Sequence, residues 1–254
     1  MSTAEKIISA LGLFTFEHPG WTVEAAAREL GLGLSTTYRY FKTLSDAGLI
    51  VASGAGRYVL GPAITQLDRQ TRLLDPLISA AKPAMQDLLR AWDGRGILLL
   101  CRLYRDQIMC VHQEAVELHE KAVGFERGRL MPLHRGAASK IVLAHLPARF
   151  VRAFHEKHAA DMAAVSLGED WDGVKRSMRR IRSAGFVVTH AEVDTAVTGI
   201  AAPVFDVDGG VVGSLGAVLS DADLRGRDLD GIAAEVKAAA RRIDEAFAAA
   251  LTPA

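Results

Sequence analysis

The stretch WTVEAAARELGLGLSTTYRYFKTLSDAGLIVASGAGRYVLG, residues 21–61, decides the fold of the first part of the chain. Thr22 is a favourable N-cap for a helix over Val23–Leu30, because its hydroxyl can accept a hydrogen bond from a first-turn N–H. A short turn with two glycines follows, and we expect Ser35 to cap a third helix that continues through Ala47. Two β-rich runs joined by a glycine-containing turn then predict a hairpin. Two helices joined by such a turn match a helix-turn-helix unit.

Helical patterns on either side of this stretch divide the chain. Apolar residues at helical spacing predict a first helix over Thr3–Phe16, and a Pro-Gly pair shortly after it would prevent its continuation. Helical pattern resumes at Pro62 and continues to about Trp92, with interruptions at Pro76 and Pro83. We therefore expect a winged helix-turn-helix domain at residues 1–61, a linker helix at 62–75 and a second domain at 76–254.

The second domain shows strands with helices between and after them, which favours an α+β fold. Strands are expected at about Ile97–Tyr104, Gln107–Glu114, Lys121–Phe125, Phe186–Ala191, Thr198–Val207 and Val211–Ser220. Helices are expected at about Gly136–Leu146, Ala148–His158, Asp170–Ala184 and Arg227–Leu251.

Composition excludes several classes of protein. Of the 254 residues, 50% are apolar and 24% charged, which is typical of a globular protein with a core rather than of a disordered chain. The 30 basic residues balance the 30 acidic ones, so net charge does not indicate a nucleic acid or a membrane as partner. No apolar run reaches the roughly 18–20 residues that span a bilayer, and the start of the chain lacks the basic region of a signal peptide. Two cysteines, Cys101 and Cys110, make no disulfide framework, so we expect a cytoplasmic protein.

The start of the third helix carries side chains suited to reading DNA. In a helix-turn-helix the second helix enters the major groove with its N-terminal residues toward the base edges. Hydroxyl groups can bind phosphates or bases there, and arginine can bind guanine through two hydrogen bonds. The candidate contacts to double-stranded operator DNA are Thr22, Ser35, Thr36, Thr37, Tyr38, Arg39, Lys42 and the wing residue Arg57. The alternative is an ordinary three-helix bundle in which Ser-Thr-Thr only caps a helix.

Three stretches of the sequence resemble the IclR family of bacterial transcriptional regulators. Residues 21–61 are similar to its winged helix-turn-helix. RGRLMPLHRGAASKIVLA (127–144) and GFVVTHAEVDTAVTGIAAPVFDVDGGVVGSLGAVLS (185–220) are similar to its effector domain. The resemblance follows the family's order over nearly the whole chain. It implies a linker helix, a GAF-like sensor domain with a central antiparallel sheet, and dimers that pair through the N-terminal half and often join into tetramers.

The resemblance also implies a small-molecule effector pocket beside the helix that opens at Gly136. First-turn N–H groups have no partner inside a helix, and the helix dipole favours negative charge there, so a carboxylate or polar group could bind. The alternative is that the small residues of this helix only pack tightly on the sheet. The residues expected to line the pocket are Cys101, Met131, Gly136, Ala137, Ala138, Thr189, Glu192, Val197, Gly199 and Gly216.

The chemistry of this pocket predicts an aromatic or otherwise larger organic effector. Family members that bind small acids often have Cys and Ser where this chain has Gly199, Gly216 and Val218. Fewer polar groups and smaller side chains leave more room, so a two- or three-carbon acid is not expected.

Two rivals come from other classes of function. Glu192 with His190 could form the acid/base pair of a small-molecule enzyme, although no nucleophile–base motif accompanies them. A sensor that has lost DNA binding is the other alternative. His155 and His158 lie three residues apart on one predicted helix but lack an evident third metal ligand, so we expect no metal and no cofactor.

Overall fold

The computed structural model describes residues 2–116 and 126–251. Contacts divide the chain into two compact units, Met1–Leu74 and Asp75–Ala254. Within the described ranges, no helix combines the length and apolar character needed to cross a membrane.

The N-terminal unit is a small helical bundle with a three-stranded sheet. Its elements are α1 (Thr3–Leu11), β1 (Gly20–Thr22), α2 (Val23–Leu30), α3 (Leu34–Asp46), β2 (Ile50–Gly54), β3 (Arg57–Leu60) and α4 (Pro62–Leu74). The first helix ends at Leu11 and not at Phe16 as expected, although Phe14 still packs against Phe41, with ring centroids 6.2 Å apart. The β1 strand was not predicted. It pairs with β3, and the sheet order is β1-β3-β2.

The cap expected at Ser35 is wrong by two positions. The α3 helix begins at Leu34, its N-cap is Gly33, and no side chain caps it. Thr22 does cap α2, since its hydroxyl accepts a hydrogen bond from the Ala25 N–H at 3.2 Å. Gly31 ends α2 with φ of 63°, a left-handed conformation that glycine adopts without steric cost.

The α4 helix follows the hairpin directly and buries none of its residues. Leu67, Leu73 and Leu74 are exposed large apolar side chains on it. Contacts place this helix with the N-terminal unit. The helical conformation is interrupted at Asp75, which is the N-cap of the next helix.

The C-terminal unit is built on a six-stranded antiparallel sheet of order β6-β5-β4-β9-β8-β7. Its strands are β4 (Ile97–Tyr104), β5 (Gln107–Glu114), β6 (Leu130–Pro132), β7 (Val187–His190), β8 (Val197–Phe205) and β9 (Val211–Ser220). Its helices are α5 (Pro76–Ala91), α6 (Ala137–His145), α7 (Ala148–Ala164), α8 (Trp171–Ala184), α9 (Asp221–Leu224) and α10 (Leu229–Leu251). The expected α+β fold class, with an antiparallel sheet in the second domain, is confirmed.

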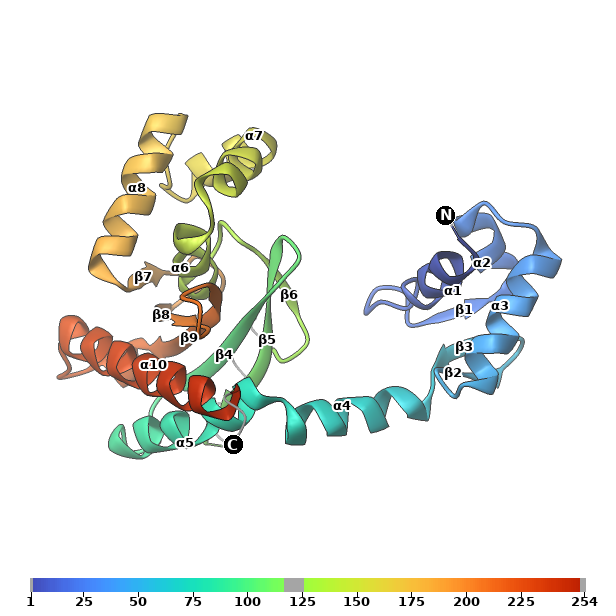
Figure 1. The fold of residues 1–254 in the computed structure, drawn as a ribbon, viewed down its shortest axis with the longest axis horizontal. Helices are drawn as coiled ribbons and strands as arrows, with labels where there is room; N and C mark the ends of the chain where they lie inside the picture. Colours follow the sequence, from blue (N-terminus) through green and yellow to red (C-terminus); the bar gives the residue numbers. More distant parts are fainter. Residues whose placement is uncertain (1, 117–125, 252–254) are drawn as a thin grey trace. The chain divides into compact units, whose positions relative to one another are not determined.

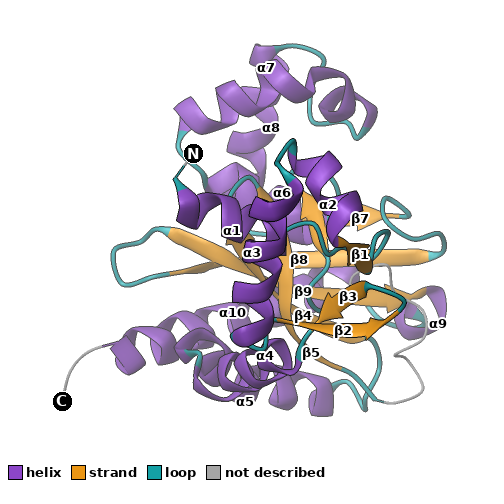
Figure 2. Cartoon of the chain, turned by 90° about the vertical axis from the view of Figure 1, so that its right-hand side faces the viewer, coloured by secondary structure: helices purple, strands orange, loops and turns teal. Residues whose placement is uncertain are grey.

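Helices cover both faces of this sheet. In Figure 1, α5 and α10 lie together on one face, while α6, α7 and α8 lie on the other. Figure 2 shows the strands between these two groups of helices. Successive side chains of β4 alternate between the faces: Leu98 and Leu100 pack toward α5 and α10, while Leu99 packs toward α6. Burial of both faces explains why the run Ile97–Cys101 is apolar throughout rather than alternating.

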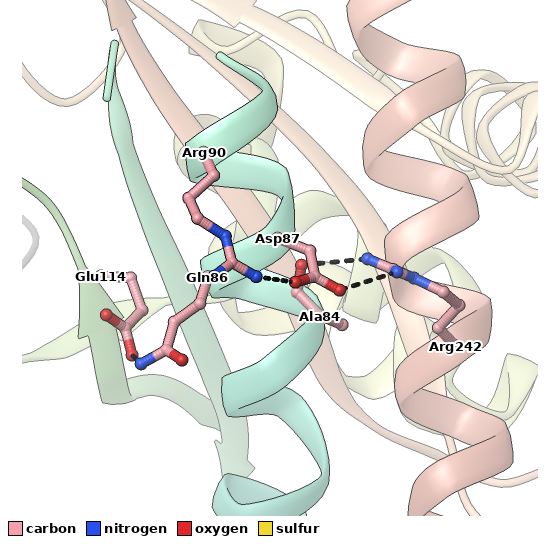
Figure 3. Close-up of polar contacts among 6 residues, drawn as sticks. All are labelled: Ala84, Gln86, Asp87, Arg90, Glu114 and Arg242. Atoms are coloured by element: carbon pink, nitrogen blue, oxygen red, sulfur yellow. Dashed lines mark hydrogen bonds and ion pairs between the residues drawn. The ribbon is translucent and has the colours of Figure 1, made fainter. Parts of the chain in front are cut away.

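Polar contacts tie α5 to its neighbours (Figure 3). Arg242 on α10 donates to the carboxylate of Asp87 and to the carbonyl of Ala84, both at 3.2 Å. On the other side of the helix, the amide of Gln86 donates to Glu114 on β5 at 3.3 Å. These contacts hold α5 against α10 and the sheet while its apolar face packs beneath them.

Further differences from the expected elements concern the second unit. The α7 helix continues to Ala164 instead of ending at His158, where the backbone is not helical (φ −128°, ψ 28°). The short α9 helix was not predicted. The expected strand at Lys121–Phe125 lies outside the described residues.

Candidate functional site

A tight turn joins the α2 and α3 helices, and α3 packs along one side of the N-terminal core. Thr37, Tyr40, Phe41 and Leu44 recur at helical spacing and are buried. The Phe41 ring meets Tyr58 of β3 edge-on, with centroids 5.3 Å apart. Because these positions fix one face of α3 to the core, the opposite face is turned to solvent.

The solvent face of α3 presents most of the predicted DNA contacts. Ser35, Tyr38, Arg39 and Lys42 are exposed, and Thr36 is partly exposed. The ammonium group of Lys42 is 3.0 Å from the carboxylate of Asp46 one turn later. The four exposed side chains combine hydroxyl groups with two cations, which are donors suited to phosphates and bases.

Thr37 does not belong with this exposed group. Its side chain is fully buried, and its hydroxyl donates to the carbonyl of Gly33 at 3.2 Å. The structure therefore differs from the expectation that Thr37 faces DNA. Thr22 is likewise engaged in capping α2, which gives its hydroxyl a structural partner.

The hairpin of β2 and β3 forms the wing. Its turn, residues 54–56, has positive φ at all three positions. Arg57 follows directly and is exposed, but its guanidinium donates to the carbonyl of Gly20 at 2.8 Å. Arg57 thereby joins the wing to β1.

A pocket lies in the C-terminal unit between the sheet and the start of α6. The empty space in it, counted together with open solvent at its mouth, is about 430 Å³, and the enclosed part is only about 40 Å³. The lining residues are Leu99, Gly136, Ala137, Ala138, Thr189, Glu192, Val193, Asp194, Val197, Gly199, Ile200, Gly216, Ala217 and Val218. Most of them are apolar or lack a side chain, and the charged ones are both acidic.

Glu192 caps the N-terminus of α6. Its carboxylate accepts a hydrogen bond from the Gly136 N–H at 3.0 Å and another from the buried ammonium of Lys140. The guanidinium of Arg135 donates to the backbone carbonyl of Glu192. One of the free N–H groups expected to attract a ligand is therefore already used by an internal carboxylate. Among the described residues, the N–H groups of Ala137 and Ala138 have no acceptor.

One hydrogen bond and one glycine position define how closely α6 packs on the sheet. The Ser214 hydroxyl on β9 donates to the carbonyl of Ala138 at 3.0 Å, within the core. A Cβ atom at Gly199 would lie 3.0 Å from the Thr189 hydroxyl and 3.5 Å from the Ala137 side chain, so this position favours glycine. Gly216 has more room, because its nearest neighbour would be 3.7 Å away.

The structure brings eight of the ten predicted pocket residues together. Cys101 and Met131 are buried in the core and do not line the pocket. Cys101 lies opposite Cys110 in the pairing of β4 with β5. Contact with the Cys110 thiol, together with burial, raises the pKa of the Cys101 thiol. Val193, Asp194 and four residues on the strands also line the pocket and were not predicted. Strand alternation could have found Leu99 and Val218, which share a face of the sheet with Gly216.

Together the two units define a class of protein. A winged helix-turn-helix with a polar reading face, followed by a separate domain that holds a pocket, is the architecture of a DNA-binding transcriptional regulator with a C-terminal regulatory domain. Family models agree: residues 3–54 match the IclR helix-turn-helix domain, and residues 74–245 match the bacterial transcriptional regulator IclR C-terminal domain. The chain belongs to the IclR family.

Known relatives support this membership. The chain is 23% identical over 207 residues to the HTH-type transcriptional regulator KipR of Bacillus subtilis, covering 80% of each protein. An IclR regulator from Alicyclobacillus acidocaldarius has a TM-score of 0.78 at 18% identity, covering 96% of this chain and 98% of that one. An IclR homolog from Microbacterium hydrocarbonoxydans, in complex with 4-hydroxybenzoate, has a TM-score of 0.73 at 20% identity, covering 98% and 100%.

The enzyme alternative is not supported by these relatives, which are transcriptional regulators. The side chains that suggested it also have other partners. His190 shares a hydrogen bond with Thr198 at 3.0 Å, and the Glu192 carboxylate is held by Gly136 and Lys140.

Proposed function

We propose that a small aromatic effector binds the pocket of the C-terminal unit and changes the affinity of α3 for operator DNA. The observation that carries this proposal is the pocket itself, which lies between the sheet and the amide groups at the start of α6. For the effector to act, it must bind more tightly to one of two forms that differ in DNA affinity.

The lining favours a flat and mainly apolar ligand. Glycine and alanine at 136–138, with Gly199 and Gly216 opposite, let a ring approach the backbone closely. Thr189 offers a hydroxyl, and the free amides of Ala137 and Ala138 can hold a polar group on the ring. The relative in complex with 4-hydroxybenzoate supports an aromatic ligand.

A carboxylate on the effector has to compete with charge that is already present. Glu192 occupies the Gly136 amide, and Asp194 also lines the pocket. An incoming carboxylate would therefore either replace Glu192 at the helix N-terminus or bind beside it against repulsion. A ring with a neutral polar group, such as a phenol or an amide, avoids this cost.

The proposed regulator acts in the cytoplasm as a dimer or a tetramer. A single helix-turn-helix domain contacts only a few phosphates. Tight operator binding therefore requires two α3 helices on half-sites about one helical turn of DNA apart. The exposed Leu67, Leu73 and Leu74 of α4 are apolar surface that pairing of two chains would cover.

Two measurements test the proposal together. Selection of bound sequences from random DNA should yield a preferred palindromic site, and calorimetric titration should show binding of benzoates, phenols or benzamides in preference to pyruvate and glyoxylate. Adding the bound compound should then shift the affinity for the selected site. Uniform, salt-sensitive binding to every duplex, or binding of the small acids alone, would contradict it.

A further inference from the structure

The loop before α6 and the middle of α7 bring three potential metal ligands together. His134 lies in that loop, while His158 and Asp161 lie on α7. Their ligand atoms all lie within 4.8 Å of one another. Nothing in the proposed effector pocket uses these side chains, and none of them lines that pocket.

The local backbone of α7 is adapted at this point. His158 has φ −128° and ψ 28°, outside the helical range, inside a helix that otherwise continues from Ala148 to Ala164. This interruption falls on one of the three potential ligands. The His158 imidazole packs on Phe154, with ring centroids 4.4 Å apart, and lies 6.0 Å from the His134 ring.

A second observation comes from the ring of His134. Its Nδ1 atom is buried and has no hydrogen-bond partner among the described residues. Buried polar atoms are nearly always paired, so an unpaired one requires an explanation. Coordination of a metal ion through this nitrogen would supply the missing partner.

We propose that His134, His158 and Asp161 bind a divalent transition-metal ion, with Zn²⁺ as the representative of its class. Two imidazoles and one carboxylate are a ligand set typical of zinc, with the fourth position left to water or another ligand. Ligands held at about 2.0–2.2 Å in a tetrahedron lie about 3.3–3.6 Å apart. The His158 Nδ1 and the Asp161 carboxylate are 3.6 Å apart, so only small movements are needed on that side.

The charges around the site are compatible with a cation. A metal ion binds the neutral imidazole of each histidine and the ionised carboxylate of the aspartate. Arg135 and Lys140 are the basic groups that act on His134, and Lys140 is neutralised by its ion pair with Glu192. Asp161 contributes the negative charge on the open side of the site.

The site differs from the pair that the sequence suggested. His155 and His158 are neighbours along the helix, but His155 packs against Trp171 with ring centroids 6.1 Å apart and does not belong to the cluster. The third ligand comes from another part of the chain, which spacing along one helix cannot reveal.

The test is zinc titration of the metal-stripped full-length protein by calorimetry at about pH 7.5. We expect one zinc ion per chain at this site. His134→Ala and His158→Ala should each weaken the affinity for zinc by at least about tenfold. Asp161 is exposed, so Asp161→Asn should weaken binding without disturbing the fold even if a histidine variant misfolds.

His155→Ala is the matched control, since it removes a histidine from the same helix and should leave zinc affinity unchanged. Cobalt substitution gives an independent readout, because a tetrahedral Co²⁺ site absorbs visible light and the Asp161→Asn variant should alter that spectrum. The proposal is overturned if Asp161→Asn and a folded His134→Ala or His158→Ala variant bind zinc like the wild type. It is also overturned if His155→Ala loses binding to the same extent.

Discussion

The Glu192 carboxylate and the Gly136 N–H, 3.0 Å apart, join the β7–β8 connection to the first residue before α6. The same carboxylate also binds the ammonium of Lys140 one turn further along the helix. A single acidic side chain thus satisfies a helix N-terminus and a buried cation at the edge of the pocket. Its removal should affect both stability and ligand preference.

Glu192→Gln should destabilise the protein by about 1–3 kcal/mol, because Lys140 would remain buried without a charged partner. Urea denaturation followed by circular dichroism measures the change. Glu156→Gln, which breaks the exposed ion pair with Arg152, is the matched control and should change stability by no more than about 0.5 kcal/mol. Equal effects of the two substitutions would show that the buried pair has no special role.

The same Glu192→Gln variant should improve the binding of aromatic acids relative to their amides. Removal of the carboxylate lowers the repulsion that an anionic ligand meets in the pocket, whereas a neutral amide is little affected. Parallel calorimetric titrations with a benzoate and the corresponding benzamide measure the ratio of affinities. A ratio that stays the same as in the wild type would place the ligand's polar group away from Glu192.

Arg39→Ala should weaken binding to the selected operator by about 1–3 kcal/mol and leave effector affinity unchanged. Arg39 is exposed on the solvent face of α3, where its guanidinium can reach a base or a phosphate. Fluorescence anisotropy with labelled duplex measures the affinity. Thr37→Val is the control from the same helix: its hydroxyl is buried, so the substitution should leave DNA affinity intact. The opposite order of effects would reverse the assignment of the two faces.

Gly213→Ala should destabilise the C-terminal unit by about 1–3 kcal/mol or more. A Cβ atom there would lie 2.0 Å from the Cys101 carbonyl oxygen on the neighbouring strand, so the pairing of β4 with β9 would have to shift. Gly216→Ala, on the same strand, meets its nearest atom at 3.7 Å and should be tolerated. Thermal denaturation compares the two variants, and similar melting temperatures would contradict the prediction.

Asp244→Asn should stabilise the protein at pH 7 by about 1 kcal/mol after allowance for solvent screening. Burial raises the pKa of the Asp244 carboxyl from 3.8 to about 6, against the opposing effect of the Phe205 N–H. Between these values the folded state holds a proton that the unfolded state has lost, so this group's contribution to stability falls as pH rises from about 4 to about 6. The advantage of the asparagine should therefore vanish near pH 4. Denaturation curves of the variant and the wild type at pH 7 and pH 4 measure this difference in stability. A stability advantage of Asp244→Asn that persists at pH 4 would contradict the assignment.

Local signals were sufficient for most of the fold. The limits predicted for the two strands after α5 match β4 and β5, because tight turns and continuous apolar runs mark them on both sides. Local signals failed where tertiary contacts decide. The apolar spacing of Phe14 suggested more helix than forms, since the ring is held by Phe41 and not by a further turn. Gly33 and not Ser35 is the N-cap of α3, because the helical conformation already begins at Leu34.

The site was less accessible to prediction than the fold. Thr37 lies three and four residues before Tyr40 and Phe41, and this helical spacing indicates that it is buried with them. Its hydroxyl group nevertheless led to the prediction of a DNA contact. The role of Glu192 at the start of α6 depends on a contact between residues far apart in the sequence, which no local pattern contains. Cys101 was placed in the pocket although its strand neighbour, Leu99, is the residue that lines it.

The bare α4 helix has a thermodynamic consequence. Isolated helices of about 12–15 residues are marginal in water, and α4 has 13 residues, none of which is buried by its own chain. On the pairing of two chains proposed above, the partner covers the leucines of α4, so this helix should lose order when the protein is diluted. The rigidity of α4 would then depend on protein concentration, and a conformational change transmitted through this helix would be weaker in the monomer.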